Sequence, residues 1–220
     1  DHDFEEIQTM NLFGKPFTWY SEQKGPVGRF KLQGLGQVRE EIKAMFSNHP
    51  DAEINSLIET YNGENLADAT RNLVHELFKK YGLVIIDADN TKLKKMFAPA
   101  IKKELLESFS FSAVEEANKQ LIIDGSKIQV NPREINLFYI LDGFRKRIIK
   151  ENEVYTIDGM PSFSEEEMLA ELDKNPERFS PNVILRPLYQ EMILPNLAYV
   201  GGAGELSYWL QLKSVFDAVK

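Results

Sequence analysis

The chain has 220 residues, of which 43% are hydrophobic, and its formal net charge is −8. This composition is typical of a soluble globular protein that buries a core. The acidic balance argues against nucleic acid as a partner, because phosphate-binding surfaces need clustered positive charge. The absence of cysteine excludes disulfides and cysteine-based metal sites, and it fits the reducing cytoplasm. No apolar run approaches the roughly 20 residues of a membrane-spanning helix.

The first part of the chain is predicted to form a hairpin followed by three helices. Two β-rich runs, 17–20 and 27–32, flank a polar turn and predict the hairpin. Apolar residues then recur at helical spacing from Gly36 to about residue 47, in a second stretch that ends near Tyr61, and over 66–81.

Gly82 follows the third predicted helix, in the position that suits a left-handed C-cap. The continuous apolar run Leu83–Ile86 comes next and ends at Asp87. A run of this length between such residues is typical of a short strand buried on both faces.

The central part is predicted to be a long amphipathic helix followed by a β-meander. The helix is expected over Thr91–Leu121, with an interruption near Pro99. The meander is expected over 134–141, 144–150 and 154–157, with Asp-Gly as the first turn. Ser164 and Glu167 then form a capping-box pattern that opens a short helix to about Leu172.

The last forty residues predict a helix, a strand, a glycine loop and a second helix. Ser180-Pro181 is an N-cap pattern, and its helix is expected to run toward Leu194 with a kink or restart at Pro187. The strand is expected over 197–200, and the second helix over 205–219. This order is that of one Rossmann-type crossover unit.

The opening residues Asp1, His2 and Asp3 form the first candidate site. An imidazole between carboxylates can act as an acid, a base or a ligand near neutral pH. The alternative interpretation is a frayed acidic terminus. No H-E-x-x-H pattern is present, and no metal site is predicted.

The second candidate site lies near the end of the chain. At about 100° per helical residue, Asn182, Arg186 and Gln190 share one polar stripe, where the guanidinium suits a carboxylate or phosphate. Gly201 and Gly202 allow a ligand to approach the backbone closely. The alternatives are a solvated helix face and tight packing, and Glu205 would repel a phosphate.

Several segments resemble the bacillithiol biosynthesis cysteine-adding enzymes, a family of cysteine ligases, and these segments span nearly the whole chain: 1–7, 81–87, 134–139, 179–191, 194–202 and 204–209. The resemblance implies an α/β fold with a Rossmann-like core related to nucleotidyl-transferring synthetases. Residues 1–35 and 176–220 would belong to this core. Residues 36–175 would be connective-peptide insertions with helices and a β-meander.

The resemblance also implies a reaction, in which the carboxyl group of L-cysteine is joined to the amine of glucosaminyl-malate, with ATP activating the carboxyl group. Asn182 and Arg186 would hold the malate carboxylates, with Gln190, Gly201 and Gly202 in the same substrate site. Asp1, His2 and Asp3 would handle the amine proton or orient the nucleophile.

The whole protein is then expected to be a homodimer held by a coiled coil outside this chain. The first residue is not methionine, which indicates a processed product or a piece of a longer chain. The resemblance implies that the chain is a central fragment of a larger enzyme, and it is expected to be inactive alone. Two alternatives remain open: a non-catalytic α/β binding or assembly domain, and an adenylate-forming enzyme with another amino acid or acceptor.

Overall fold

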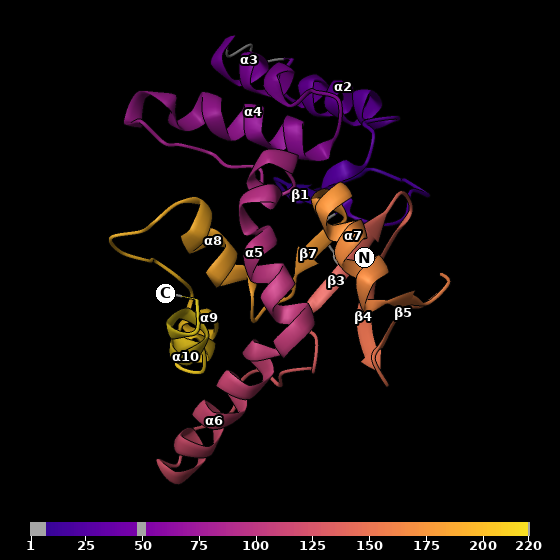
Figure 1. Cartoon of the computed structure of the whole chain (residues 1–220). Helices are drawn as coiled ribbons and strands as arrows, with labels where there is room; N and C mark the ends of the chain where they lie inside the picture. Colours follow the sequence, from indigo (N-terminus) through magenta and orange to yellow (C-terminus); the bar gives the residue numbers. More distant parts are fainter. Residues whose placement is uncertain (1–7, 48–51, 220) are drawn as a thin grey trace. The chain divides into compact units, whose positions relative to one another are not determined.

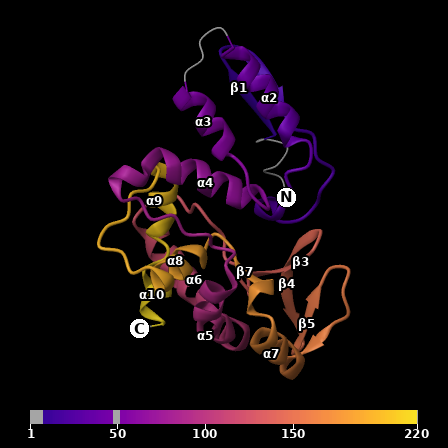
Figure 2. The same cartoon turned by 90° about the horizontal axis from the view of Figure 1, so that it is seen from above.

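The computed structural model describes residues 8–47 and 52–219, which fall into two compact units. The first unit comprises the residues up to Asp87 together with the hairpin tip 141–145, and the second comprises the remainder. Figures 1 and 2 show the helices and strands of both units.

The first unit combines a two-stranded sheet with helices. Its core contains Trp19, Phe30, Leu35 and Leu66, and the Trp19 indole N–H donates to the carbonyl of Gln33 at 2.8 Å. The elements of this unit are β1 (Thr9–Leu12), β2 (Lys15–Thr18), the 3-10 helix η1 (Val27–Arg29), α2 (Leu35–Met45), α3 (Ala52–Thr60), α4 (Leu66–Phe78) and the 3-10 helix η2 (Lys79–Tyr81).

The predicted hairpin partner of residues 17–20 is wrong. Phe17 lies in β2 and pairs with Met10 of β1, whereas Val27–Arg29 is a 3-10 helix. The turn between β1 and β2 contains Phe13 and Gly14 with φ of 50° and 80°. Two successive positive φ angles match the twist of a tight hairpin. The strand joined to β2 by this short turn is therefore its partner.

The predicted helices of this unit are confirmed as α2, α3 and α4, and Gly82 ends η2 with a left-handed φ of 72°. The predicted strand Leu83–Ile86 is wrong, because these residues form no strand and Val84 is 75% exposed. A strand buried on both faces needs neighbouring strands. Within the described ranges, none lies alongside this run.

The second unit contains a five-stranded sheet in the order β6-β5-β4-β3-β7 (Figure 1). Helix α5 contacts β7, and helix α7 contacts β5 and β6. Strand β3 pairs with β7, β4 with β5, and β5 with β6, and all three pairs are antiparallel. The elements are α5 (Thr91–Glu107), α6 (Phe109–Ile123), β3 (Leu137–Leu141), β4 (Phe144–Glu151), β5 (Val154–Ile157), β6 (Phe163–Ser164), α7 (Glu165–Lys174), the 3-10 helix η3 (Pro176–Arg178), β7 (Phe179–Pro181), α8 (Arg186–Ile193), α9 (Ala203–Trp209) and α10 (Lys213–Asp217).

The predicted meander is confirmed as β3, β4 and β5. Asn152 and Glu153 turn between β4 and β5 with φ of 49° and 67°. The capping box is also confirmed, because the Ser164 hydroxyl accepts from the backbone N–H of Glu167 at 3.2 Å and the Glu167 carboxylate accepts from that of Ser164 at 2.8 Å. This reciprocal pair begins α7.

The predicted interruption near Pro99 is wrong, because α5 continues through this residue. Pro99 and Lys95 are both exposed. Water can therefore hydrogen-bond the Lys95 carbonyl, which loses its helical partner at the proline. The helix ends instead at Ser108, whose φ of 47° is left-handed, and α6 begins immediately after it.

The predicted helix start at Ser180 is wrong, whereas the restart at Pro187 is confirmed. Ser180 lies in β7 and pairs with Phe138, and α8 begins at Arg186 with Pro187 in its first turn. The predicted strand over 197–200 is also wrong: these residues form no strand, and Leu197 is fully exposed. The final predicted helix is divided into α9 and α10.

A buried carboxylate connects the main elements of the second unit. Glu104 in α5 is fully buried. Its oxygens accept hydrogen bonds from the Ser110 hydroxyl at 2.7 Å, the Ser110 N–H at 3.1 Å and the Asn136 N–H at 2.9 Å. Burial raises the pKa of the Glu104 carboxyl group above its ordinary value, although these hydrogen bonds oppose the rise.

Replacement of this carboxylate should destabilise the protein. Glu104→Ala is expected to lower the free energy of unfolding by about 3 kcal/mol, because buried donors of Ser110 and Asn136 lose their acceptor. Urea denaturation measures the change. The matched control is Glu107→Ala on the same helix, where an exposed ion pair with Lys103 contributes less than about 0.5 kcal/mol. Equal effects of the two substitutions would contradict this role of Glu104.

The raised pKa of Glu104 also predicts a pH dependence. Above the pKa of the unfolded state and up to the folded-state pKa, the folded protein binds the proton more tightly, so the stability contributed by Glu104 falls as pH rises. Glu104→Gln should remove this component from a plot of unfolding free energy against pH. An unchanged pH profile in the variant would show that Glu104 does not titrate in this way.

Candidate functional site

The structure describes one of the two predicted groups of site residues but not the other. Asp1, His2 and Asp3 lie outside the described residues. The substrate-site residues, from Asn182 to Gly202, all belong to the second unit, and their geometry can be followed atom by atom.

Arg186, at the start of α8, is the centre of a polar cluster. Its Nη1 donates to the Gln190 Oε1 at 3.1 Å, which confirms that these two side chains share a face. Its Nη2 donates to the Tyr208 hydroxyl at 3.0 Å and to the Glu205 carboxylate. The Tyr208 hydroxyl also donates to Glu205, at 2.9 Å. The Arg186 side chain remains 40% exposed, so solvent and ligands can reach it.

Two members of this cluster, Glu205 and Tyr208, were not among the predicted site residues. They lie three residues apart in α9 and therefore on one face of that helix. The i, i+3 spacing of Glu205 and Tyr208 in the sequence indicates that their side chains lie close together. Their contact with Arg186 could not be predicted from spacing, because it depends on how α9 packs against α8.

The side chain of Asn182 forms its hydrogen bonds with groups outside this cluster. Its Nδ2 donates to Asn136 Oδ1 at 2.8 Å. Its own Oδ1 accepts from the backbone N–H groups of Ile184 at 2.9 Å and Leu185 at 3.3 Å. The stripe predicted for residues 182, 186 and 190 assumed a continuous helix, but α8 begins only at Arg186.

Gly201 and Gly202 precede α9 and have different surroundings. A Cβ at Gly201 would lie 2.7 Å from a ring carbon of Tyr199, whereas a Cβ at Gly202 would meet no atom within 4 Å. The Tyr199 ring stacks on Trp209, with ring centroids 4.2 Å apart. The absence of a side chain at Gly201 therefore allows Tyr199 to approach the backbone.

The Arg186 cluster can bind a polar molecule that carries both signs of charge. The guanidinium and the amide of Gln190 can donate to a carboxylate, and the Glu205 carboxylate can accept from an amine. In the structure the guanidinium already contacts Glu205. A ligand carboxylate would exchange with Glu205 or share the guanidinium with it.

A second cluster contains the same three residue types in a more buried setting. Arg178 Nη1 donates to Glu171 Oε1 at 2.8 Å and to the Tyr139 hydroxyl at 3.4 Å. The Tyr139 hydroxyl donates to Glu171 at 2.6 Å. Burial and the adjacent carboxylate raise the pKa of Tyr139 to about 12. This cluster joins β3 to α7 and η3, and its tyrosine belongs to the core.

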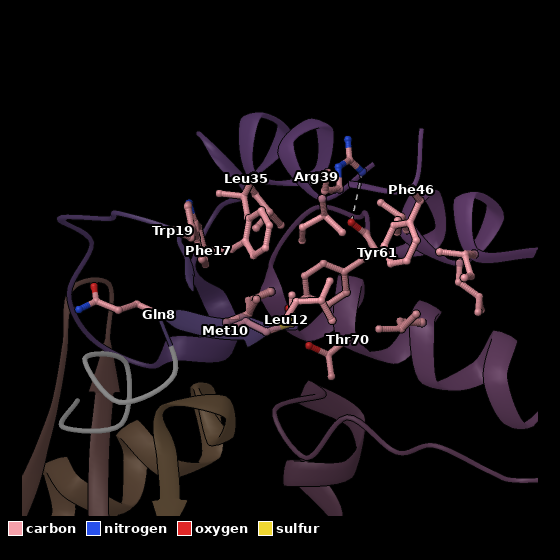
Figure 3. A pocket seen from close by; sticks show the side chains of 17 residues that line it. Gln8, Met10, Leu12, Phe17, Trp19, Leu35, Arg39, Phe46, Tyr61 and Thr70 are labelled. Atoms are coloured by element: carbon pink, nitrogen blue, oxygen red, sulfur yellow. Dashed lines mark hydrogen bonds between the residues drawn. The ribbon is translucent and has the colours of Figure 1, made fainter. Parts of the chain in front are cut away.

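An apolar pocket of about 610 Å³ lies in the first unit, between the β1-β2 hairpin and α2, α3 and α4 (Figure 3). Phe17, Trp19 and Leu35 contribute to its lining. At its edge, Arg39 Nη1 donates to the carbonyl of Tyr61 at 3.2 Å. The lining suits an apolar group. It does not suit a sugar or a dicarboxylate as well as the Arg186 cluster does.

Over residues 8–47 and 52–219, no three His, Asp or Glu side chains gather in a way that could hold a metal ion. In the same ranges, no helix has the length and apolar character needed to cross a bilayer.

The comparisons with known proteins cover the whole chain. The family model described as "Bacillithiol biosynthesis BshC, N-terminal Rossmann-like domain" matches residues 1–220. Relatives named "Putative cysteine ligase BshC" are 52% identical in Flavobacterium johnsoniae, over 100% of this chain and 42% of that protein, and 47% identical in Cytophaga hutchinsonii, over 98% and 40%. A Bacillus cereus relative of the same name is 30% identical, over 100% and 44%. The chain thus spans about two-fifths of the curated relatives.

The two glycines before α9 provide a matched pair of substitutions. Gly201→Ala should displace the Tyr199 ring and disturb its stacking on Trp209, because the new Cβ would clash with that ring. Gly202→Ala should leave the stacking intact. Near-ultraviolet circular dichroism of the aromatic side chains measures the difference. Identical spectra for both variants would contradict the packing role of Gly201.

Proposed function

Since this chain belongs to the BshC family as its N-terminal Rossmann-like domain, we propose that the whole protein is a cysteine ligase of bacillithiol biosynthesis. It joins the carboxyl group of L-cysteine to the amine of glucosaminyl-malate and forms an amide bond. The family match and the names of the relatives support this proposal. The match also confirms the resemblance and the Rossmann-like α/β fold class inferred from the sequence.

The observation that carries the proposal is the Arg186 cluster. A malate group presents carboxylates, and a guanidinium supported by Gln190 and Tyr208 binds a carboxylate through directed, charge-assisted hydrogen bonds. Glu205 adds an acceptor suited to the amine of the same molecule. We therefore assign Arg186 and Gln190 to the glucosaminyl-malate site, with Gly201 and Gly202 in the adjoining loop.

Asp1, His2 and Asp3 complete the proposed site. In this proposal they take up the proton that the attacking amine releases, or orient that amine. The support for this role is the sequence motif and the family match, since these residues lie outside the described ranges. Residues 1–220 alone are proposed to be inactive.

ATP remains the proposed source of energy for activating the cysteine carboxyl group, and this part of the proposal depends on the resemblance alone. The described residues near the glycine loop do not fit a triphosphate. Glu205 places a carboxylate in the first turn of α9, and the nearby guanidinium of Arg186 is paired with it. A cytoplasmic location and a coiled-coil homodimer also remain proposals.

Arg186→Ala in the whole enzyme should raise KM for glucosaminyl-malate about tenfold or more, because a charge-assisted hydrogen bond contributes roughly 1.5–3 kcal/mol. Steady-state kinetics measure the change. Arg178→Ala is the matched control, since it removes arginine from a cluster of the same composition. It should lower stability and leave KM unchanged. An unaltered KM in Arg186→Ala would exclude Arg186 from the substrate site.

The reaction itself can be tested in cells by thiol profiling. Deletion of the whole gene should abolish bacillithiol and cause glucosaminyl-malate to accumulate, because the last joining step is lost. The gene that encodes the intact protein should restore the thiol. Unchanged bacillithiol after deletion would instead favour a non-catalytic domain or a ligase with other substrates.

A further inference from the structure

We propose that Asn182 is a positioning residue, which fixes the first turn of α8 and thereby the place of Arg186, and that it does not contact the substrate. This inference rests on the proposed function of Arg186 as a substrate-binding residue. It assigns Asn182 a different role from the one that the sequence motif implied.

The amide orientation of Asn136 is determined by its neighbours. Its Nδ2 lies 2.8 Å from the Ser110 hydroxyl, 2.7 Å from the Arg133 carbonyl and 3.3 Å from Glu104 Oε1. Two of these three groups can only accept a hydrogen bond from an amide. Asn136 Oδ1 must therefore face the other way, where it accepts from the Arg133 N–H at 3.0 Å. Asn136 is fully buried, so this arrangement is shielded from water.

The orientation of Asn136 determines that of Asn182. Because Asn136 Oδ1 is an acceptor, the group 2.8 Å from it must be the Nδ2 of Asn182. The Asn182 Oδ1 then points to the turn before α8 and caps the N–H groups of Ile184 and Leu185. The backbone N–H of Asn182 also donates to the Asn136 carbonyl, at 3.1 Å. Asn182 is thus attached to Asn136 by both its side chain and its backbone.

These contacts leave Asn182 little capacity for a ligand. Its Oδ1 accepts two hydrogen bonds, and its carbonyl accepts one from the Arg186 N–H at 2.9 Å. One hydrogen of Nδ2 is donated to Asn136. A substrate carboxylate could receive at most the second hydrogen of Nδ2, and the side chain lies outside the cluster that surrounds Arg186.

The same contacts place Arg186. Ile184 and Leu185 are fully buried, so their capped N–H groups have no access to water and depend on Asn182. The Asn182 carbonyl receives the Arg186 N–H at the first residue of α8. With this turn fixed, the Arg186 guanidinium reaches Gln190 and Tyr208. Loss of the cap would free the turn and move the guanidinium.

A double-mutant cycle in the whole enzyme tests the proposal. Asn182→Ala and Arg186→Ala should each raise KM for glucosaminyl-malate, by about threefold or more and about tenfold or more respectively, with a smaller change in kcat. The double variant should have the KM of Arg186→Ala within about twofold, because Asn182 acts through Arg186. If Asn182 contacted the substrate, the two increases would multiply, and the proposal would be overturned.

Asn182→Ser is the conservative variant, and it also serves if Asn182→Ala fails to fold. The serine hydroxyl can still accept from the N–H groups of the turn, although it is too short to replace Nδ2. Its KM should lie clearly below that of Asn182→Ala, or close to the wild-type value if the alanine variant yields no folded enzyme. A serine variant whose KM rises as much as that of Arg186→Ala, which loses a contact with the substrate, would overturn the positioning role.

The outcome for Arg186 separates this inference from the proposed function. If Arg186→Ala leaves KM unchanged, the proposed substrate site is wrong. If Arg186→Ala raises KM but Asn182→Ala does not, the substrate site stands and the positioning role is overturned. Thermal unfolding of each variant shows whether a KM change accompanies a general loss of structure, which would also affect kcat through the amount of active enzyme.

Discussion

The second unit depends on the hydrogen bonds of one buried carboxylate. Removing the charge of Glu104 from water is costly, and the structure compensates with neutral donors rather than with a cation. These donors come from α6 and from the residue before β3. The carboxylate can therefore be satisfied only when α5, α6 and the start of β3 are assembled together. Asn136 extends this constraint to the segment before α8, and so to the candidate site.

The local elements were predictable where the sequence itself supplies the partner. Helices α2, α3 and α4 follow the spacing of their own apolar residues, and Ser164 and Glu167 satisfy each other's backbone groups within one turn. The meander was predictable because short turns determine which strands pair. Strands without such a turn were predicted incorrectly. Residues 83–86 and 197–200 have the right composition for strands, but a strand also needs the backbone of a neighbour, which composition does not specify.

The candidate site was predictable only in part. The contact of Arg186 with Gln190 follows from helical spacing, and the chemistry of a guanidinium suggested an anionic ligand. Asn182 had the same spacing, but β7 continues to Pro181 and the helix begins after the asparagine. The roles of Glu104 and Asn136 were missed altogether. Their contacts join segments far apart in the sequence, and such contacts cannot be predicted from a local sequence pattern.

The ion pair of Arg186 with Glu205 has a consequence for recognition. A long, flexible side chain loses conformational entropy when a ligand holds it in one rotamer. Here the guanidinium is already held by groups of the protein, so this entropy is lost during folding rather than during binding. A ligand carboxylate that exchanges with Glu205 therefore meets a guanidinium that is already ordered, and its affinity depends on how its contacts with Arg186 compare with those of the carboxylate that it replaces.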